Sequence, residues 1–137
     1  MRFEDSPLSK SLSYEKMILD FGTNYLFDKF FIMEVNEGVH FNSDTLNTLL
    51  AEIRKHYGSH RQLAYIANRV NSYSIDPVLW SYFDEDDSIL IAAAIVSYRD
   101  STLMSANIEK QLSSISMKRS TTIEEAIDWV IGLAEIN

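Results

Sequence analysis

Residues 89–96 read Ile-Leu-Ile-Ala-Ala-Ala-Ile-Val, which are eight consecutive apolar residues. The acidic run Asp84–Asp87 precedes them, and the polar stretch Ser97–Ser101 follows. The stretch is too short to cross a bilayer, which takes about 20 residues, and it lacks the polar positions of a half-exposed helix. Its length, β-branched residues and polar flanks are typical of a strand buried on both faces. It therefore predicts an α/β fold with a parallel sheet covered by helices.

The composition excludes several classes of partner. The chain has 137 residues, which indicates one domain, and its 20 acidic and 12 basic residues give a formal net charge of −8. Nucleic-acid binding needs cations that displace phosphate counterions, yet the densest basic cluster is the pair Lys118-Arg119. We therefore expect no nucleic-acid partner, and the same charge argument disfavours an anionic membrane surface.

The chain contains no cysteine, so disulfides, thiolate–zinc sites and cysteine catalysis are excluded. Residues 1–12 are polar and include Ser6-Pro7, which predicts a flexible lead-in. They lack the apolar core of a signal peptide. We predict a single domain over residues 13–137, located in the cytoplasm and not inserted in a membrane.

The remaining patterns predict a mixed order of strands and helices. Tyr14–Phe21 and Tyr25–Val35 alternate around the turn Gly22-Thr23-Asn24, which predicts an antiparallel hairpin. Further strands are predicted at Gln62–Ala67, Ile89–Val96 and Ile115–Lys118. Helices are predicted at about Ser43–Tyr57, Pro77–Phe83, Ser101–Leu112 and from Thr122 onward. The order ββαβαβαβα gives a mixed, mostly parallel five-stranded sheet covered by about four helices.

Two helix starts carry local capping signals. Asp76-Pro77 combines a carboxylate cap with proline at the first helical position, where the missing N–H costs nothing. Thr121-Thr122-Ile123-Glu124 fits the capping box, in which a hydroxyl and a glutamate satisfy backbone N–H groups reciprocally.

No residue pattern indicates catalysis. His56 and His60 have a spacing that can place two metal ligands on one helical face, but Gly58 breaks the helix between them. The run Asp84–Asp87 lacks the alternation that aims carboxylates at one Ca²⁺. The serines lie outside any nucleophile elbow, and the scattered glycines form no phosphate-binding loop. We therefore expect no metal, no cofactor and no enzymatic activity.

The segment from Asn68 to Pro77 links the carboxyl end of a predicted central strand to a capped helix. In open α/β sheets, ligands and partners bind at such strand ends. Ser72, Tyr73 and Ser74 place hydroxyls near a helix N-terminus, which favours an added phosphate, and Arg69 could pair with that charge. An ordinary turn rich in serine and asparagine accounts for the same residues.

The chain resembles the STAS domain, the fold of sulfate transporters and anti-sigma-factor antagonists, and more closely its SpoIIAA-like relatives. The resemblance covers about Tyr14 to Ala134. It is carried by the predicted element order and by three segments, Gln62–Ala67 with the residues that follow to Pro77, Ala92–Val96, and Glu124–Trp129. An acidic-Ala-Ile-x-Trp ending is typical of the SpoIIAA-like group.

In antagonist members of the STAS family, the loop after this strand carries an Asp-Ser pair, and phosphorylation of that serine by a partner kinase switches binding off. This chain has Asn71-Ser72-Tyr73-Ser74 instead. The resemblance implies a non-enzymatic regulatory module that docks a partner protein through the loop 69–76 and the helix after it. The implied contact residues are Arg69, Asn71, Ser72, Tyr73 and Ser74, with Ser72 and Ser74 as candidate phosphorylation sites.

Two further roles stay open. Some members of the superfamily resemble Sec14-type lipid carriers, which implies, as the alternative, a small-ligand or lipid-binding carrier with an apolar pocket between the sheet and the helices. A homodimer is also compatible with the sequence.

Overall fold

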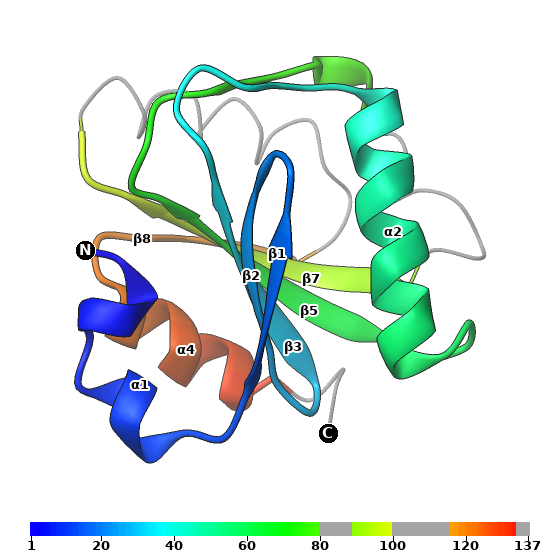
Figure 1. Ribbon diagram of the computed structural model, residues 1–137. Helices are drawn as coiled ribbons and strands as arrows, with labels where there is room; N and C mark the ends of the chain where they lie inside the picture. The colour runs from blue at the N-terminus through cyan, green and yellow to red at the C-terminus, as the bar shows by residue number, and fades with distance from the viewer. Residues whose placement is uncertain (80–88, 100–115, 134–137) are drawn as a thin grey trace.

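The computed structural model describes residues 1–79, 89–99 and 116–133 (Figure 1). Six strands form one sheet in the order β1-β2-β3-β5-β7-β8. The first three pair antiparallel, and the pairs from β3 to β8 are parallel. Their bounds are β1 Glu15–Leu19, β2 Gly22–Leu26, β3 Phe30–Val35, β5 Leu63–Arg69, β7 Leu90–Ser97 and β8 Ser116–Ser120. The predicted mixed, mostly parallel sheet is confirmed.

The sheet has six strands rather than the predicted five because the opening hairpin is a three-stranded meander. The turn predicted at Gly22-Thr23-Asn24 is wrong, since these residues begin β2 and the chain turns at residues 20–21 instead. Gly22 is needed for close packing: a Cβ there would lie 2.5 Å from the Glu34 carbonyl oxygen. A second turn, closed by the hydrogen bond from Phe27 N to Phe30 O (2.9 Å), divides the predicted second strand.

Two helices begin and end where local signals place them. α2 (Ser43–Tyr57) has the predicted bounds, and Asn42 Oδ1 caps it by accepting a hydrogen bond from Thr45 N (3.1 Å). Gly58, with a φ of 90°, ends it in a conformation that favours glycine. α4 (Ile123–Ile131) is capped by Thr122, whose Oγ1 accepts from Glu125 N (3.1 Å), so the cap is the second threonine of the pair.

Other predicted elements fall partly or wholly outside the described residues. Residues 77–79 form one 3-10 turn, and Asp76 Oδ1 accepts a hydrogen bond from Val78 N (3.1 Å), as expected of a cap. The rest of the predicted helix to Phe83, the acidic run 84–87 and the predicted helix 101–112 lie outside the described ranges. In the described ranges, no helix is long and apolar enough to cross a membrane.

The N-terminal residues are part of the fold, which corrects the predicted flexible lead-in at 1–12. They form a 3-10 turn, η1 (Phe3–Asp5), and a short helix, α1 (Leu8–Ser11). The Phe3 side chain is fully buried, with its ring centroid 5.1 Å from that of Tyr14 and 5.0 Å from that of Tyr25. Contacts with these rings anchor a segment whose own sequence is polar.

Two apolar clusters cover the two faces of the sheet. α2 packs on one face, and α4 with the N-terminal segment packs on the other. β7 contributes to both: Ala93 and Ile95 face the α2 side, whereas Ala92, Ala94 and Val96 face the α4 side. All five are fully buried, which confirms the strand predicted at Ile89–Val96 with both faces buried.

An Ala93→Asp change should destabilise the fold by roughly 4 kcal/mol, because it places an unpaired carboxylate in the α2-side core. The matched control is Ala51→Asp on the exposed side of α2, where the loss should stay near the ~0.7 kcal/mol of helix propensity. Urea unfolding of both variants measures the difference. Equal destabilisation of the two variants would contradict the burial assigned to β7.

Candidate functional site

The carboxyl ends of the parallel strands meet at one edge of the sheet, and two segments leave that edge side by side. Residues 36–41 follow β3, and residues 70–76 follow β5. They pair through a two-stranded parallel sheet of β4 (His40–Phe41) and β6 (Ser74–Ile75), as the adjacent cyan and green traces of Figure 1 show. We call these two paired segments, with Arg69, the ledge.

Backbone hydrogen bonds fasten the two segments of the ledge to each other. Gly38 N donates to Ser72 O (2.8 Å), and Ser74 N donates to Val39 O (3.0 Å). Asp76 N donates to Phe41 O (2.9 Å). The predicted docking loop is therefore held along its length rather than anchored only at its ends.

Two of the predicted contact residues, Arg69 and Asn71, point inward. Arg69 ends β5 and is only 8% exposed, and its guanidinium carbon lies 5.6 Å from the centre of the Tyr73 ring. Asn71 is half-buried and donates from Nδ2 to Val35 O (3.1 Å). These residues support the loop, and Tyr73, also half-buried, packs against the α2-side core.

The two serines of the loop are exposed, and each hydroxyl has a nitrogen partner from another part of the chain. Ser72 Oγ accepts a hydrogen bond from Arg99 Nη1, and Ser72 N donates to Glu37 Oε2 (2.7 Å). Ser74 Oγ lies 2.7 Å from His40 Nδ1. From the sequence, Arg69 was the residue predicted to pair with a phosphate on this loop. In the structure, the arginine that contacts Ser72 is Arg99.

A small apolar cavity lies beneath the ledge, on the α2 side of the sheet. Its volume is about 50 Å³, and its lining includes Phe31, Leu49, Tyr65 and Ile75. Arg69 and Tyr73 line it as well, so a cation and a phenol border an otherwise apolar space.

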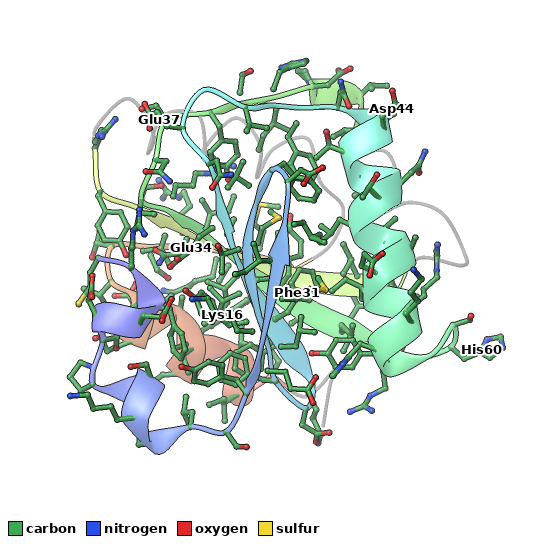
Figure 2. All side chains as sticks on the ribbon, viewed as in Figure 1. Lys16, Phe31, Glu34, Glu37, Asp44 and His60 are labelled. Atoms are coloured by element: carbon green, nitrogen blue, oxygen red, sulfur yellow. The ribbon has the colours of Figure 1, made fainter. Side chains whose placement is uncertain are left out.

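A buried polar cluster lies on the opposite face at the same edge, and the sequence analysis missed it. Glu34, on β3, is 6% exposed, and its Oε2 accepts hydrogen bonds from Phe3 N (2.8 Å) and Asn68 Nδ2 (2.6 Å). Asn68 Nδ2 also donates to Met1 O (2.9 Å), and Asn68 Oδ1 accepts from the Tyr98 hydroxyl (2.7 Å). Figure 2 shows Glu34 beside the N-terminal segment, which this cluster holds in place.

Burial raises the pKa of the Glu34 carboxyl, because the charged form loses hydration. The hydrogen bonds from Phe3 and Asn68 oppose that effect, as does the charge of Arg2, whereas Glu4 adds to it. The signal that could have revealed this site is a glutamate at an inward position of an otherwise apolar strand.

No metal-binding cluster of three or more histidine, cysteine, aspartate or glutamate residues occurs in the parts of the chain that the structure describes. His56 Nδ1 lies 3.3 Å from Glu15 Oε2, and both residues are exposed. His56 lies in the last turn of α2, whereas His60 is exposed in the connection after the helix (Figure 2).

No known family model and no curated protein matches this chain. A solved structure does match: an uncharacterised protein from the DUF3478 family with a SpoIIAA-like fold, from Shewanella loihica PV-4. The likeness has a TM-score of 0.54 and covers 86% of this chain and 92% of that chain. The chain has a SpoIIAA-like fold. Because the sequences are 5% identical, the likeness confirms the predicted fold and extends no further.

Glu34→Gln should change how the free energy of unfolding depends on pH. From about pH 4.5 to its raised pKa, Glu34 binds more protons in the folded than in the unfolded state, so its contribution to stability falls as pH rises through that window. Glutamine keeps an oxygen that can accept both hydrogen bonds but does not titrate. As pH rises, the free energy of unfolding of the variant should therefore increase relative to that of the parent. The total increase should be about 1.4 kcal/mol for each unit by which the fold raises the Glu34 pKa.

Urea unfolding of Glu34→Gln and of the parent at a series of pH values between 4 and 8 tests this prediction. A constant difference for Glu34→Gln across that range would contradict the elevated pKa.

Proposed function

We propose that this chain is a cytoplasmic, non-enzymatic protein-interaction module and that a partner protein docks on the ledge. The observation that carries the proposal is the pairing of β4 with β6, which holds two exposed serines, Ser72 and Ser74, on fixed backbone at the carboxyl edge of the sheet. The SpoIIAA-like fold supports the non-enzymatic role, because the resemblance implies binding modules rather than catalysts.

The fixed geometry of the ledge favours binding. A loop that is disordered before binding loses conformational entropy when a partner orders it, at roughly 1–2 kcal/mol per residue of backbone. Here the hydrogen bonds to Val39 and Phe41, together with the Asn71 side chain, already order the loop in the folded chain. Its conformational entropy is therefore lost on folding and not on binding. Binding energy gained at Ser72 and Ser74 is then available for affinity.

Phosphorylation of Ser72 or Ser74 is the regulatory step that we propose. A phosphoryl group on Ser72 would sit beside the Arg99 guanidinium, which favours a charge-assisted hydrogen bond. It would also repel Glu37, whose carboxylate accepts the Ser72 backbone N–H. On Ser74, it would meet His40. The added charge would alter the electrostatics and the contacts of the ledge and so weaken docking.

A second candidate function, a small-ligand carrier, is favoured by the cavity beneath the ledge. Sites for drug-sized ligands measure about 300–1,000 Å³, whereas this cavity has about 50 Å³. One water needs roughly 10–15 Å³ by the same measure, so the cavity suits a few water-sized groups and not an acyl chain. The size of the cavity favours a small apolar molecule over a lipid as its ligand. Because the cavity is so small, we rank protein docking ahead of the carrier function.

Ser72→Glu and Ser74→Glu should each leave stability within about 0.5 kcal/mol, because both side chains are exposed. Each should weaken binding of the partner about tenfold or more, equivalent to a loss of ~1.4 kcal/mol in binding free energy. Affinity capture with mass spectrometry identifies the partner, and calorimetric titration with the purified partner measures the change. Ser59→Glu, an exposed serine away from the ledge, is the control. Unchanged affinity in both ledge variants, or an equal loss in the control, would refute docking at the ledge.

Ala67→Leu should fill the cavity, because Ala67 lines it and is 3% exposed. Benzene added to the parent should shift the NMR signals of the lining residues, and the shifts should disappear in the variant. Overpacking costs about 1–3 kcal/mol, so circular dichroism must show that the variant is folded. Ala51→Leu, on the exposed side of α2, should behave like the parent. If benzene shifts no NMR signals of the lining residues in the parent, the proposed carrier function is wrong.

A further inference from the structure

The first strand, β1, is an edge strand of the sheet that the structure describes. Among the strands that the structure describes, β1 pairs only with β2 (Figure 1). Ile18, the fourth of its five residues, is 72% exposed, and Met17 and Leu19 on either side are half-buried. An edge strand with an exposed apolar side chain presents backbone and side-chain groups that can pair with another strand.

The turn after β1 decides which backbone groups point outward. Residues 20–21 connect Leu19 to its partner Gly22, so the hairpin has a two-residue turn. In such hairpins the residues flanking the turn exchange hydrogen bonds, and hydrogen-bonded pairs alternate along the strands. Leu19 and Met17 therefore direct their N–H and C=O groups toward β2, whereas Ile18 and Lys16 direct theirs to the open edge.

Two copies of β1 fit together in an antiparallel register centred on Ile18. With Ile18 opposite Ile18 of the other copy, Lys16 of each copy stands opposite Asp20 of the other, and Met17 stands opposite Leu19. Directly opposite strand residues lie on the same face with Cβ atoms about 4.5–5.5 Å apart, close enough for the apolar pairs to interact. Asp20, the first residue of the turn, follows directly after Leu19 and so lies next to Lys16 of the other copy. The arrangement is self-complementary, as a two-fold axis requires.

Charge selects this register over its neighbours. A slip of one residue would place outward groups of one copy against inward groups of the other. A slip of two would place Lys16 or Asp20 opposite Ile18 and remove both ion pairs. Lys16 Nζ already donates to Glu4 Oε1 (2.7 Å), but an ammonium has three donors, so it can also bind Asp20 of the other copy. Lys16 projects from β1 near the N-terminal segment (Figure 2).

We propose that a second copy of this chain binds the β1 edge and that the two six-stranded sheets join through antiparallel β1–β1 pairing into one continuous sheet. Pairing of residues 16–20 of each copy belongs with small interfaces of less than ~1,200 Å². The dimer is therefore in concentration-dependent exchange with the monomer.

Sedimentation velocity of the full chain across a concentration series tests the dimer. The parent should shift from monomer to dimer, and Ile18→Lys should remain a monomer at every concentration, because it places two ammonium groups opposite each other. Ile131→Lys, at an apolar position on α4 that is 49% exposed, should dimerise like the parent. A parent that stays monomeric up to millimolar concentration, or an Ile18→Lys variant that still dimerises, would overturn the proposal.

Charge exchange tests the register. Asp20→Lys alone should weaken dimerisation at least tenfold, because it sets a second cation against Lys16 of the other copy. Combining it with Lys16→Glu should restore the ion pairs with reversed polarity and recover most of the parent affinity. A double variant that dimerises no better than Asp20→Lys would refute this register.

Because the chain has no cysteine, one introduced thiol can report the contact directly. Ile18→Cys should give a disulfide-linked dimer under mild oxidation, since opposite Cα atoms in such a pair lie within the ~4.4–6.8 Å that a disulfide spans. Ile131→Cys should give none. Equal cross-linking of both variants would show random collision and would contradict β1 pairing.

Discussion

Parallel strands with both faces buried are the constraint on which this structure depends. Such strands cannot be joined by tight turns and must be covered on both sides. Here α2 covers one face, and α4 with the N-terminal segment covers the other. The successive alanines of β7 at residues 92–94 leave space on both faces for larger side chains, among them Ile53 of α2 and Ile127 of α4.

The same constraint brings the functional candidates together. Because β3 and β5 run parallel, the segments after them emerge side by side, pair as β4 and β6, and form the ledge over the apolar cavity. On the other face of that edge, Glu34 and Asn68 fasten the N-terminal segment. If β1 joins two copies, each dimer carries two ledges, and a partner with two docking motifs would gain avidity without any new contact.

Local signals in the sequence were sufficient for much of the fold. The apolar run at 89–96 predicted a strand buried on both faces, and Gly58 marked the end of α2. The threonine pair before Ile123 predicted the start of α4. Together with the element order, these signals supported the SpoIIAA-like resemblance that the solved structure confirms as a fold. They succeed because periodicity and capping depend on residues within a few positions of one another.

Contacts between distant residues were decided by the tertiary structure alone. The sequence located the loop 69–76, but the inward orientation of Arg69 and the approach of Arg99 to Ser72 depend on how β5 and β7 pair. The N-terminal residues looked flexible because Phe3 finds its aromatic partners only after the meander folds. Likewise, the carboxylate of Glu34 meets Asn68, 34 positions away, only because β3 and β5 are neighbours. Hydrophobic periodicity specifies which face a side chain takes, whereas its partner across the sheet is fixed by the order of the strands.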